Sequence, residues 1–199
     1  GNPVDIKSYD CDRRADGNQH PRVLYLGWIV REKGVYDLVD AIPKVLMAVP
    51  EVRFTFAGNN EVDNLSNLIS ARGLNGSAEV VGWIDGQAKI DLMKSSSILV
   101  LPSYTEGIPN VILEAMANRV PNVTSPVGGI PSVLEHDRTA IFVEPKNIQS
   151  ISEGLIALLT NEQKSRTLAD AAFERASKLY SIEAIGDGLT RVYGQYRNK

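Results

Sequence analysis

The sequence has one cysteine, Cys11, among 199 residues. A single cysteine cannot form a disulfide within the chain, so we expect a hydrophobic core to hold the fold, in a reducing compartment. No apolar run approaches the roughly 18 residues that a membrane span requires, and the first residues do not have the pattern of a signal peptide. These absences favour a globular domain without disulfides or membrane spans.

Basic residues are not in excess either. The chain has 21 Lys and Arg against 24 Asp and Glu, which gives a net charge of −3. A nucleic-acid-binding protein usually presents a basic face, so we expect no nucleic acid partner. Hydrophobic residues make up 43% and charged residues 23% of the chain, close to the average of globular proteins, which argues against disorder.

Short apolar runs alternate with helical patterns along most of the chain. The runs predict strands at residues 22–27, 52–58, 79–82, 98–101, 122–125 and 140–143. The periodic segments predict helices at residues 35–49, 64–73, 87–94, 109–118, 130–135, 148–159, 161–179 and 181–196. We therefore expect an α/β fold, a Rossmann-like parallel sheet of about six strands flanked by helices, in one domain over residues 22–199. The polar residues 1–21 read as a linker.

The loop after the first predicted strand contains two glycines and two cations. Gly27 and Gly34 permit tight turns, and Arg31 and Lys33 lie just before a predicted helix, where phosphate is favoured. Ligands of such sheets bind beyond the carboxyl ends of the strands. Taken alone, this loop fits an ordinary solvated surface loop at least as well. It has neither the P-loop pattern nor G-x-G-x-x-G, which removes the main support for a nicotinamide site.

The segment after the fourth predicted strand contains two carboxylates. Pro109 suits the first position of the following helix, which is apolar on almost every side and therefore expected to be buried. A buried Glu114 needs hydrogen-bond donors, either ligand hydroxyls or a structural partner such as Arg119. Glu106 precedes the helix at the expected ligand edge, where it could also act as a simple partner of the helix dipole. Together the two glutamates favour a polyhydroxylated, phosphorylated ligand.

These motifs resemble the group 1 glycosyltransferases, the retaining glycosyltransferases of family 4. Seven residues separate Glu106 from Glu114, as in the E-x7-E signature of that family. Residues 99–134, LVLPSYTEGIPNVILEAMANRVPNVTSPVGGIPSVL, resemble its donor-binding core, and residues 26–34, LGWIVREKG, resemble its loop with lysine followed by glycine. The resemblance covers roughly residues 22–160 and implies the C-terminal, donor-binding half of a GT-B fold.

The resemblance also implies roles for individual residues. Glu106 would contact hydroxyls of the donor sugar, and Lys33 would neutralise the diphosphate, so these two are the candidate catalytic residues. Glu114 would hold the ribose hydroxyls. Further contacts to the donor are implied for Gly27, Arg31, Trp83, Gly107, Ile108 and Asn110. The resemblance implies no cofactor besides the nucleoside diphosphate sugar and no metal, and the Asp10-Cys11-Asp12 motif lies in the predicted linker.

The implied reaction is transfer of a sugar, of the hexosyl type and with retention, to an acceptor hydroxyl in cell-surface glycan biosynthesis. The acceptor would be a glycan or a lipid-linked molecule bound through an N-terminal domain, in the cytoplasm or at the inner face of the membrane, with peripheral membrane association of the full-length protein. This fragment alone is expected to be inactive. Trp28 stands where the family has arginine, which favours an alternative, a non-catalytic nucleotide-sugar-binding module. A nucleoside diphosphate sugar epimerase on the same scaffold is a further alternative.

Overall fold

The central feature of the fold is a six-stranded sheet in which every pairing is parallel. The computed structural model describes residues 20–179, so nearly all of the predicted linker and the predicted helix at 181–196 lie outside the described residues. The strands are β1 (Arg22–Leu26), β2 (Arg53–Ala57), β3 (Ala78–Gly82), β4 (Ile98–Leu101), β5 (Asn122–Thr124) and β6 (Ile141–Phe142). The six predicted strands are confirmed.

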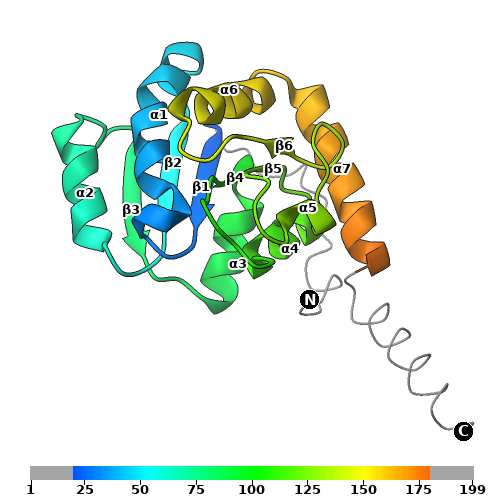
Figure 1. Cartoon of the computed structure of the whole chain (residues 1–199). Helices are drawn as coiled ribbons and strands as arrows, with labels where there is room; N and C mark the ends of the chain where they lie inside the picture. The colour runs from blue at the N-terminus through cyan, green and yellow to red at the C-terminus, as the bar shows by residue number, and fades with distance from the viewer. Residues whose placement is uncertain (1–19, 180–199) are drawn as a thin grey trace, which may run out of the picture.

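The strand order is β3-β2-β1-β4-β5-β6, so the chain moves outward from β1 to β3 and then returns to the other side of β1 (Figure 1). The order therefore reverses between β1 and β4, which pair in register at Val23 with Ile98 and at Leu24 with Leu99. Open α/β sheets bind ligands in the crevice at such a switch point, beyond the carboxyl ends of the strands. The topology thus selects the loops after β1 and β4.

The described region has seven α-helices. They are α1 (Val35–Ala48), α2 (Val62–Ala71), α3 (Gly86–Lys94), α4 (Asn110–Ala117), α5 (Ile130–Val133), α6 (Ile148–Leu159) and α7 (Glu162–Leu179). Helices α1 to α5 connect the strands, and α6 and α7 follow β6. A short 3₁₀ helix, η3 (Arg31–Lys33), lies inside the loop after β1 and was not predicted from the sequence. No helix within residues 20–179 is long and apolar enough to cross a membrane.

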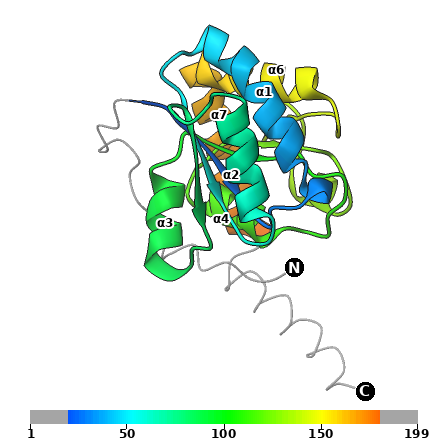
Figure 2. The same ribbon diagram turned by 90° about the vertical axis from the view of Figure 1, so that its left-hand side faces the viewer.

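The helices form a layer on each side of the sheet. In Figure 2, α3 lies on one side of the strands and α1, α2 and α6 lie on the other. Helix α1 packs against α6, and α4 packs against α7. All four residues of β4 are buried, as expected for an apolar strand that is covered on both faces.

Candidate functional site

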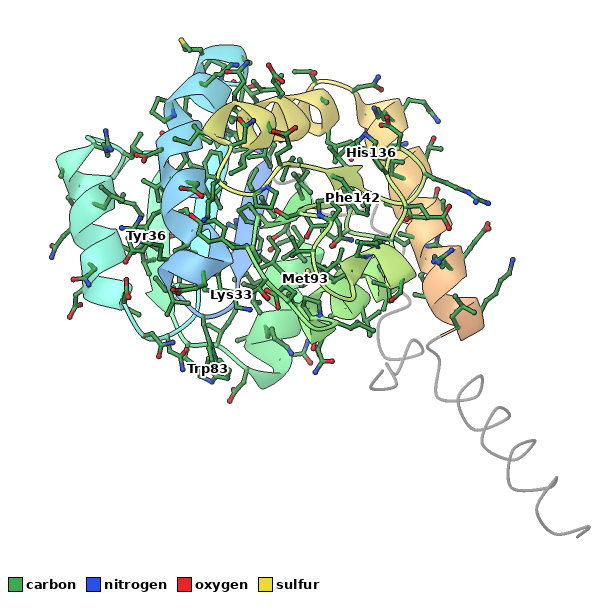
Figure 3. The ribbon with its side chains drawn as sticks, in the orientation of Figure 1. Lys33, Tyr36, Trp83, Met93, His136 and Phe142 are labelled. Atoms are coloured by element: carbon green, nitrogen blue, oxygen red, sulfur yellow. The ribbon has the colours of Figure 1, made fainter. Side chains whose placement is uncertain are left out.

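The candidate site begins at the carboxyl ends of β1 and β4, where a lysine from the loop after β1 contacts a glutamate from the loop after β4. Lys33, the last residue of η3, places its Nζ 2.7 Å from Oε1 of Glu106. The Lys33 side chain is 23% exposed and that of Glu106 is 9% exposed. Ser103 donates its hydroxyl to the same Glu106 oxygen at 2.7 Å. Figure 3 labels Lys33. The two candidate catalytic residues predicted from the sequence are therefore in direct contact.

A buried tyrosine lies below this pair. Tyr25, on β1, is 1% exposed and donates its hydroxyl to the backbone oxygen of Trp28 at 2.6 Å. Burial, and secondarily the negative charge of Glu106, raise the pKa of Tyr25 well above its ordinary value. The hydroxyl therefore stays protonated and available as the donor that holds the loop after β1.

Backbone contacts lock the loop after β1 to the loop after β4. Gly34 has φ 67°, and a Cβ at this position would lie 2.1 Å from the backbone oxygen of Pro102, so no other residue fits without a shift of the chain. The N–H of Tyr104 donates to the backbone oxygen of Glu32 at 2.8 Å. These contacts fix the relative position of the two loops and hence of Lys33 and Glu106.

The side chain of Tyr104 extends this connection to α1. Its hydroxyl donates to Oδ2 of Asp37 at 2.7 Å. Burial, followed by this hydrogen bond, raises the pKa of Tyr104 to about 12. The Nζ of Lys146 lies 4.9 Å from the centre of the Tyr104 ring, within the range of a cation–π contact.

The loop after β5 closes against Glu106 from the other side. Gly128 has φ 55°, and a Cβ there would lie 1.7 Å from the backbone oxygen of Glu106. The N–H of Gly129 donates to the backbone oxygen of Gly107 at 2.9 Å. The sequence predicted that this glycine pair allows a close backbone approach, and the structure shows that the approaching backbone is that of Glu106 and Gly107.

The predicted backbone contacts lie at the start of α4. Gly107 and Asn110 are exposed, and Ile108 is 36% exposed. The helix begins at Asn110, and Pro109 is its N-cap, with φ −67° and ψ 127°. The expectation that Pro109 is the first helical residue was thus wrong by one position. An extended ψ is what proline adopts readily at a cap, where its missing N–H leaves no hydrogen bond unmade.

Glu114 lies on the buried helix α4, as predicted, and the structure pairs it with a lysine of α3. The Nζ of Lys89, on α3, is 2.7 Å from Oε1 of Glu114. The alternative partner, Arg119, instead places Nη1 2.7 Å from Oδ1 of Asp170 and its guanidinium carbon 3.8 Å from the centre of the Phe173 ring. Arg119 follows the helix with φ 52°, and its side chain contacts Asp170 and Phe173 of α7. Sequence reasoning missed Lys89, because no motif links two helices that meet only in three dimensions.

The remaining predicted residues surround these two pairs at the carboxyl edge of the sheet. Gly27 directly follows β1, and its N–H donates to the backbone oxygen of Ala57 at 3.0 Å. Arg31 lies on η3 with its guanidinium carbon 5.3 Å from the centre of the Tyr36 ring. Trp83, which follows β3 and is labelled in Figure 3, has an exposed fraction of 63%. Trp28, in the loop with Lys33, is 59% exposed. Two large aromatic surfaces therefore face solvent at this edge.

Metal-ligating side chains do not gather at this edge. Among residues 20–179 no group of three or more His, Cys, Asp or Glu side chains could hold a metal ion. The Asp10-Cys11-Asp12 motif lies outside the described residues. The cationic groups available to an anionic ligand here are side chains such as Lys33.

Comparison with known proteins identifies the family. The family model of group 1 glycosyl transferases matches residues 12–175, which is most of the chain. The chain belongs to the group 1 glycosyl transferases. Alpha-D-kanosaminyltransferase of Streptomyces kanamyceticus is 30% identical to this chain over 177 residues. The match covers 88% of this chain and 46% of that relative. The chain thus spans about half the length of the curated relatives it matches.

Solved structures show the same relation. Sucrose-phosphate synthase from Thermosynechococcus elongatus superposes with a TM-score of 0.85 at 26% identity, over 99% of this chain and 52% of that one. The C-terminal domain of a group 1 family protein from Francisella tularensis matches with a TM-score of 0.78 at 22% identity, over 90% of this chain and 99% of that domain. Anabaena Alr3699/HepE in complex with UDP-glucose matches with a TM-score of 0.84 at 21% identity, over 97% of this chain and 56% of that one. The fold is therefore one half of a GT-B glycosyltransferase.

Proposed function

We propose that this chain is the donor-binding half of a retaining glycosyltransferase, which moves a sugar from a nucleoside diphosphate sugar to an acceptor hydroxyl. The observation that supports this most directly is the contact of Lys33 with Glu106 at the switch point of the sheet, 2.7 Å apart. A lysine and a carboxylate so placed offer opposite charges to opposite parts of one ligand. The ammonium suits the diphosphate, and the carboxylate accepts hydrogen bonds from sugar hydroxyls.

In the proposed reaction the diphosphate leaves the anomeric carbon with its bonding electrons. Lys33 stabilises the negative charge that develops on the leaving oxygens, and backbone N–H groups at the start of α4 add to this. Glu106 orients the sugar through its hydroxyls, which reduces the entropy lost on the way to the transition state. Glu114 accepts hydrogen bonds from the ribose. The acceptor hydroxyl attacks the anomeric carbon on the face that the diphosphate leaves, and its proton passes to an oxygen of the departing diphosphate as the new glycosidic bond forms.

The finer parts of this proposal concern the whole protein. We propose that it acts in cell-surface glycan biosynthesis on a glycan or lipid-linked acceptor, in the cytoplasm or at the inner face of the cell membrane. Acceptor contacts would come from the half of the GT-B fold that this chain does not span. The chain alone should therefore bind a donor nucleotide but transfer no sugar.

Calorimetric titration of the 199-residue chain with UDP, GDP and ADP tests the proposal. We expect at least one nucleoside diphosphate to bind, and the corresponding nucleotide sugar to bind in competition with it. Titration with inorganic phosphate is the reference for unspecific anion binding. If all three nucleotides bind no better than phosphate, the chain is not a donor-binding domain.

One observation favours a second candidate, a non-catalytic nucleotide-sugar-binding module. Trp28 is 59% exposed in the loop that contains Lys33, where a second cation for the diphosphate would otherwise be expected. Transfer of sugar by the full-length protein to a defined acceptor distinguishes the two candidates. Transfer supports the enzyme, whereas nucleotide-sugar binding without transfer or hydrolysis supports the module. Turnover of the nucleotide sugar without any acceptor would instead indicate an epimerase.

A further inference from the structure

The site has a second lysine–glutamate contact, which joins α3 to α4. Lys89 lies on α3 and Glu114 on α4, and their side chains are 28% and 17% exposed. The 2.7 Å contact spans two helices, and a small hollow between these helices is lined by Lys89, Ile90, Met93, Glu114 and Asn118. An ionised carboxylate on a largely buried helix is costly without a donor, so Lys89 supplies a group that Glu114 needs.

The contact occupies only part of the Glu114 carboxylate. Lys89 donates to Oε1, and an ionised carboxylate has two oxygens with about four acceptor positions in all. Acceptor capacity for further donors therefore remains on the second oxygen. A lysine that fixes one oxygen also fixes the plane in which the other one lies.

We propose that Lys89 is a positioning residue for the nucleoside part of the donor. It holds Glu114 by one carboxylate oxygen so that the other accepts the vicinal hydroxyls of the ribose. This inference rests on the proposed function, and it adds the contribution of α3 to the site. The same segment holds Trp83, three residues before the helix begins at Gly86. A shift of α3 would thus move the candidate base contact and the ribose contact together.

A competing role for Lys89, in which it opposes ribose binding, predicts a different effect of its removal on nucleotide affinity. If the ammonium merely neutralises Glu114 when no ligand is bound, it competes with ribose hydroxyls for the carboxylate, and its removal should strengthen nucleotide binding. A general cation for the phosphates would act without regard to the ribose. The three roles are separated by a ligand that lacks the ribose hydroxyls.

The experiment measures a hydroxyl ratio, defined as the Kd of the 2′,3′-dideoxy nucleoside diphosphate divided by the Kd of the ordinary one. The base is the one among UDP, GDP and ADP that binds the unaltered chain. For that chain we expect a ratio of about ten, the scale of a hydrogen bond to a charged group. Lys89→Met should weaken binding of the ordinary nucleotide several-fold, leave the dideoxy analogue unchanged and bring the ratio toward one. Lys89→Arg, which keeps a donor to Glu114, should retain most of the ratio.

The matched control is Lys44→Met. Lys44 also pairs with a glutamate, Glu153, at 3.6 Å, but it lies on α1 away from Glu114. Its removal should leave both dissociation constants unchanged. Thermal melting confirms that each variant is folded, and Lys89→Gln replaces Lys89→Met if the latter is not.

Three results overturn the inference while leaving the proposed function in place. They are an unchanged ratio in Lys89→Met, tighter binding of the ordinary nucleotide, and equal weakening of both ligands. If the unaltered chain binds no nucleoside diphosphate, the proposed function fails and this inference fails with it. The first measurement of the series therefore separates the two cases.

Discussion

Two lysine–glutamate pairs with the same nitrogen–oxygen separation, 2.7 Å, lie at one edge of this sheet in different surroundings. Lys33 and Glu106 come from loops, whereas Lys89 and Glu114 come from helices. Around Glu106 the backbone is enclosed on both sides, by the Gly34–Pro102 approach and by Gly128. Glu114 takes its place from the packing of α4 and receives one hydrogen bond from another side chain, that of Lys89.

The difference shows that the loop pair and the helix pair are positioned by different contacts. A loop has no regular hydrogen-bond ladder, so its position must come from close backbone contacts, and these require glycine at the points of approach. The backbone of a helix is held by its own hydrogen bonds, so a charged side chain on it requires only a partner of opposite charge. We therefore expect backbone changes to disrupt the first pair most strongly and side-chain changes to distinguish the two pairs.

The largest expected effect is that of Gly128→Ala. The added Cβ would lie 1.7 Å from the Glu106 backbone oxygen, at a φ of 55° that alanine rarely adopts. Strain and overpacking together should lower the free energy of unfolding by about 2–4 kcal/mol. Urea denaturation measures this loss, and titration with the nucleotide sugar should show weakened binding because Glu106 must move.

The control for this change is Gly76→Ala. A Cβ at Gly76 would have no heavy atom within 4 Å. The free energy of unfolding of Gly76→Ala should change little, or rise slightly because alanine lowers the conformational entropy of the unfolded chain. Equal stability of the two alanine variants would mean that the loop after β5 shifts to accommodate the added Cβ without a loss of unfolding free energy.

Lys33→Ala breaks the first pair from the lysine side. If Lys33 binds the diphosphate, the variant should lose about 1–3 kcal/mol of binding free energy for the nucleoside diphosphate, the scale of a charge-assisted hydrogen bond. Lys44→Ala, on α1, is the matched control and should bind as the unaltered chain does. Equal affinity of Lys33→Ala and Lys44→Ala in calorimetry would remove Lys33 from the site.

Glu106→Gln and Glu114→Gln separate the roles of the two pairs. Glutamine keeps the size of the side chain, so neither change should open a cavity. Glu106→Gln should spare the free nucleoside diphosphate and cost about 1–3 kcal/mol on the nucleotide sugar, because the proposed contact of Glu106 is to the sugar alone. Glu114→Gln should weaken both ligands, because both contain ribose.

Four calorimetric values, two variants with two ligands, decide this prediction. Equal weakening of both ligands by Glu106→Gln would contradict its assignment to the sugar. A change of stability without any change of affinity in Glu114→Gln would leave Glu114 as a structural partner of Lys89.

The smallest expected effect is that of Tyr104→Phe, which removes the hydrogen bond to Asp37. The loss should be about 1 kcal/mol of unfolding free energy at neutral pH. The pKa of Tyr104 is raised to about 12 in the folded protein, against about 10 when unfolded. The contribution is therefore complete below pH 10 and is lost as the pH rises through about 12.

Urea denaturation of both proteins between pH 7 and 11 checks this. The stability difference should shrink at the alkaline end. Tyr36→Phe is the control, because the pKa of Tyr36 is also raised to about 12 by burial and its hydrogen bond to Glu61. Tyr36 joins α1 to Glu61, the residue before α2, and phenylalanine keeps the ring that faces Arg31, so only Tyr104→Phe should also weaken nucleotide-sugar binding.

Much of the fold was predictable because local patterns and parallel-sheet rules agree. Strand β4 is four apolar residues in a row, stopped by Pro102, and α4 is apolar on nearly every side, so both are buried whatever surrounds them. The element ends moved by a residue at places such as Pro109, where a cap and a first helical residue look alike in sequence. The short helix η3 was missed because a single turn has too few residues to show a period.

The family, the α/β class and the candidates Lys33, Glu106 and Glu114 can be read from the amino-acid sequence, since they depend on residue types at fixed spacings along one chain. The partners of these side chains follow from the three-dimensional fold. The contact of Lys33 with Glu106 joins positions 73 apart, and that of Lys89 with Glu114 joins two helices of one layer. Arg119, five residues from Glu114 in sequence, instead contacts Asp170 on α7. Charge partners are chosen by distance in space, and that distance exists only after the strands have taken their order.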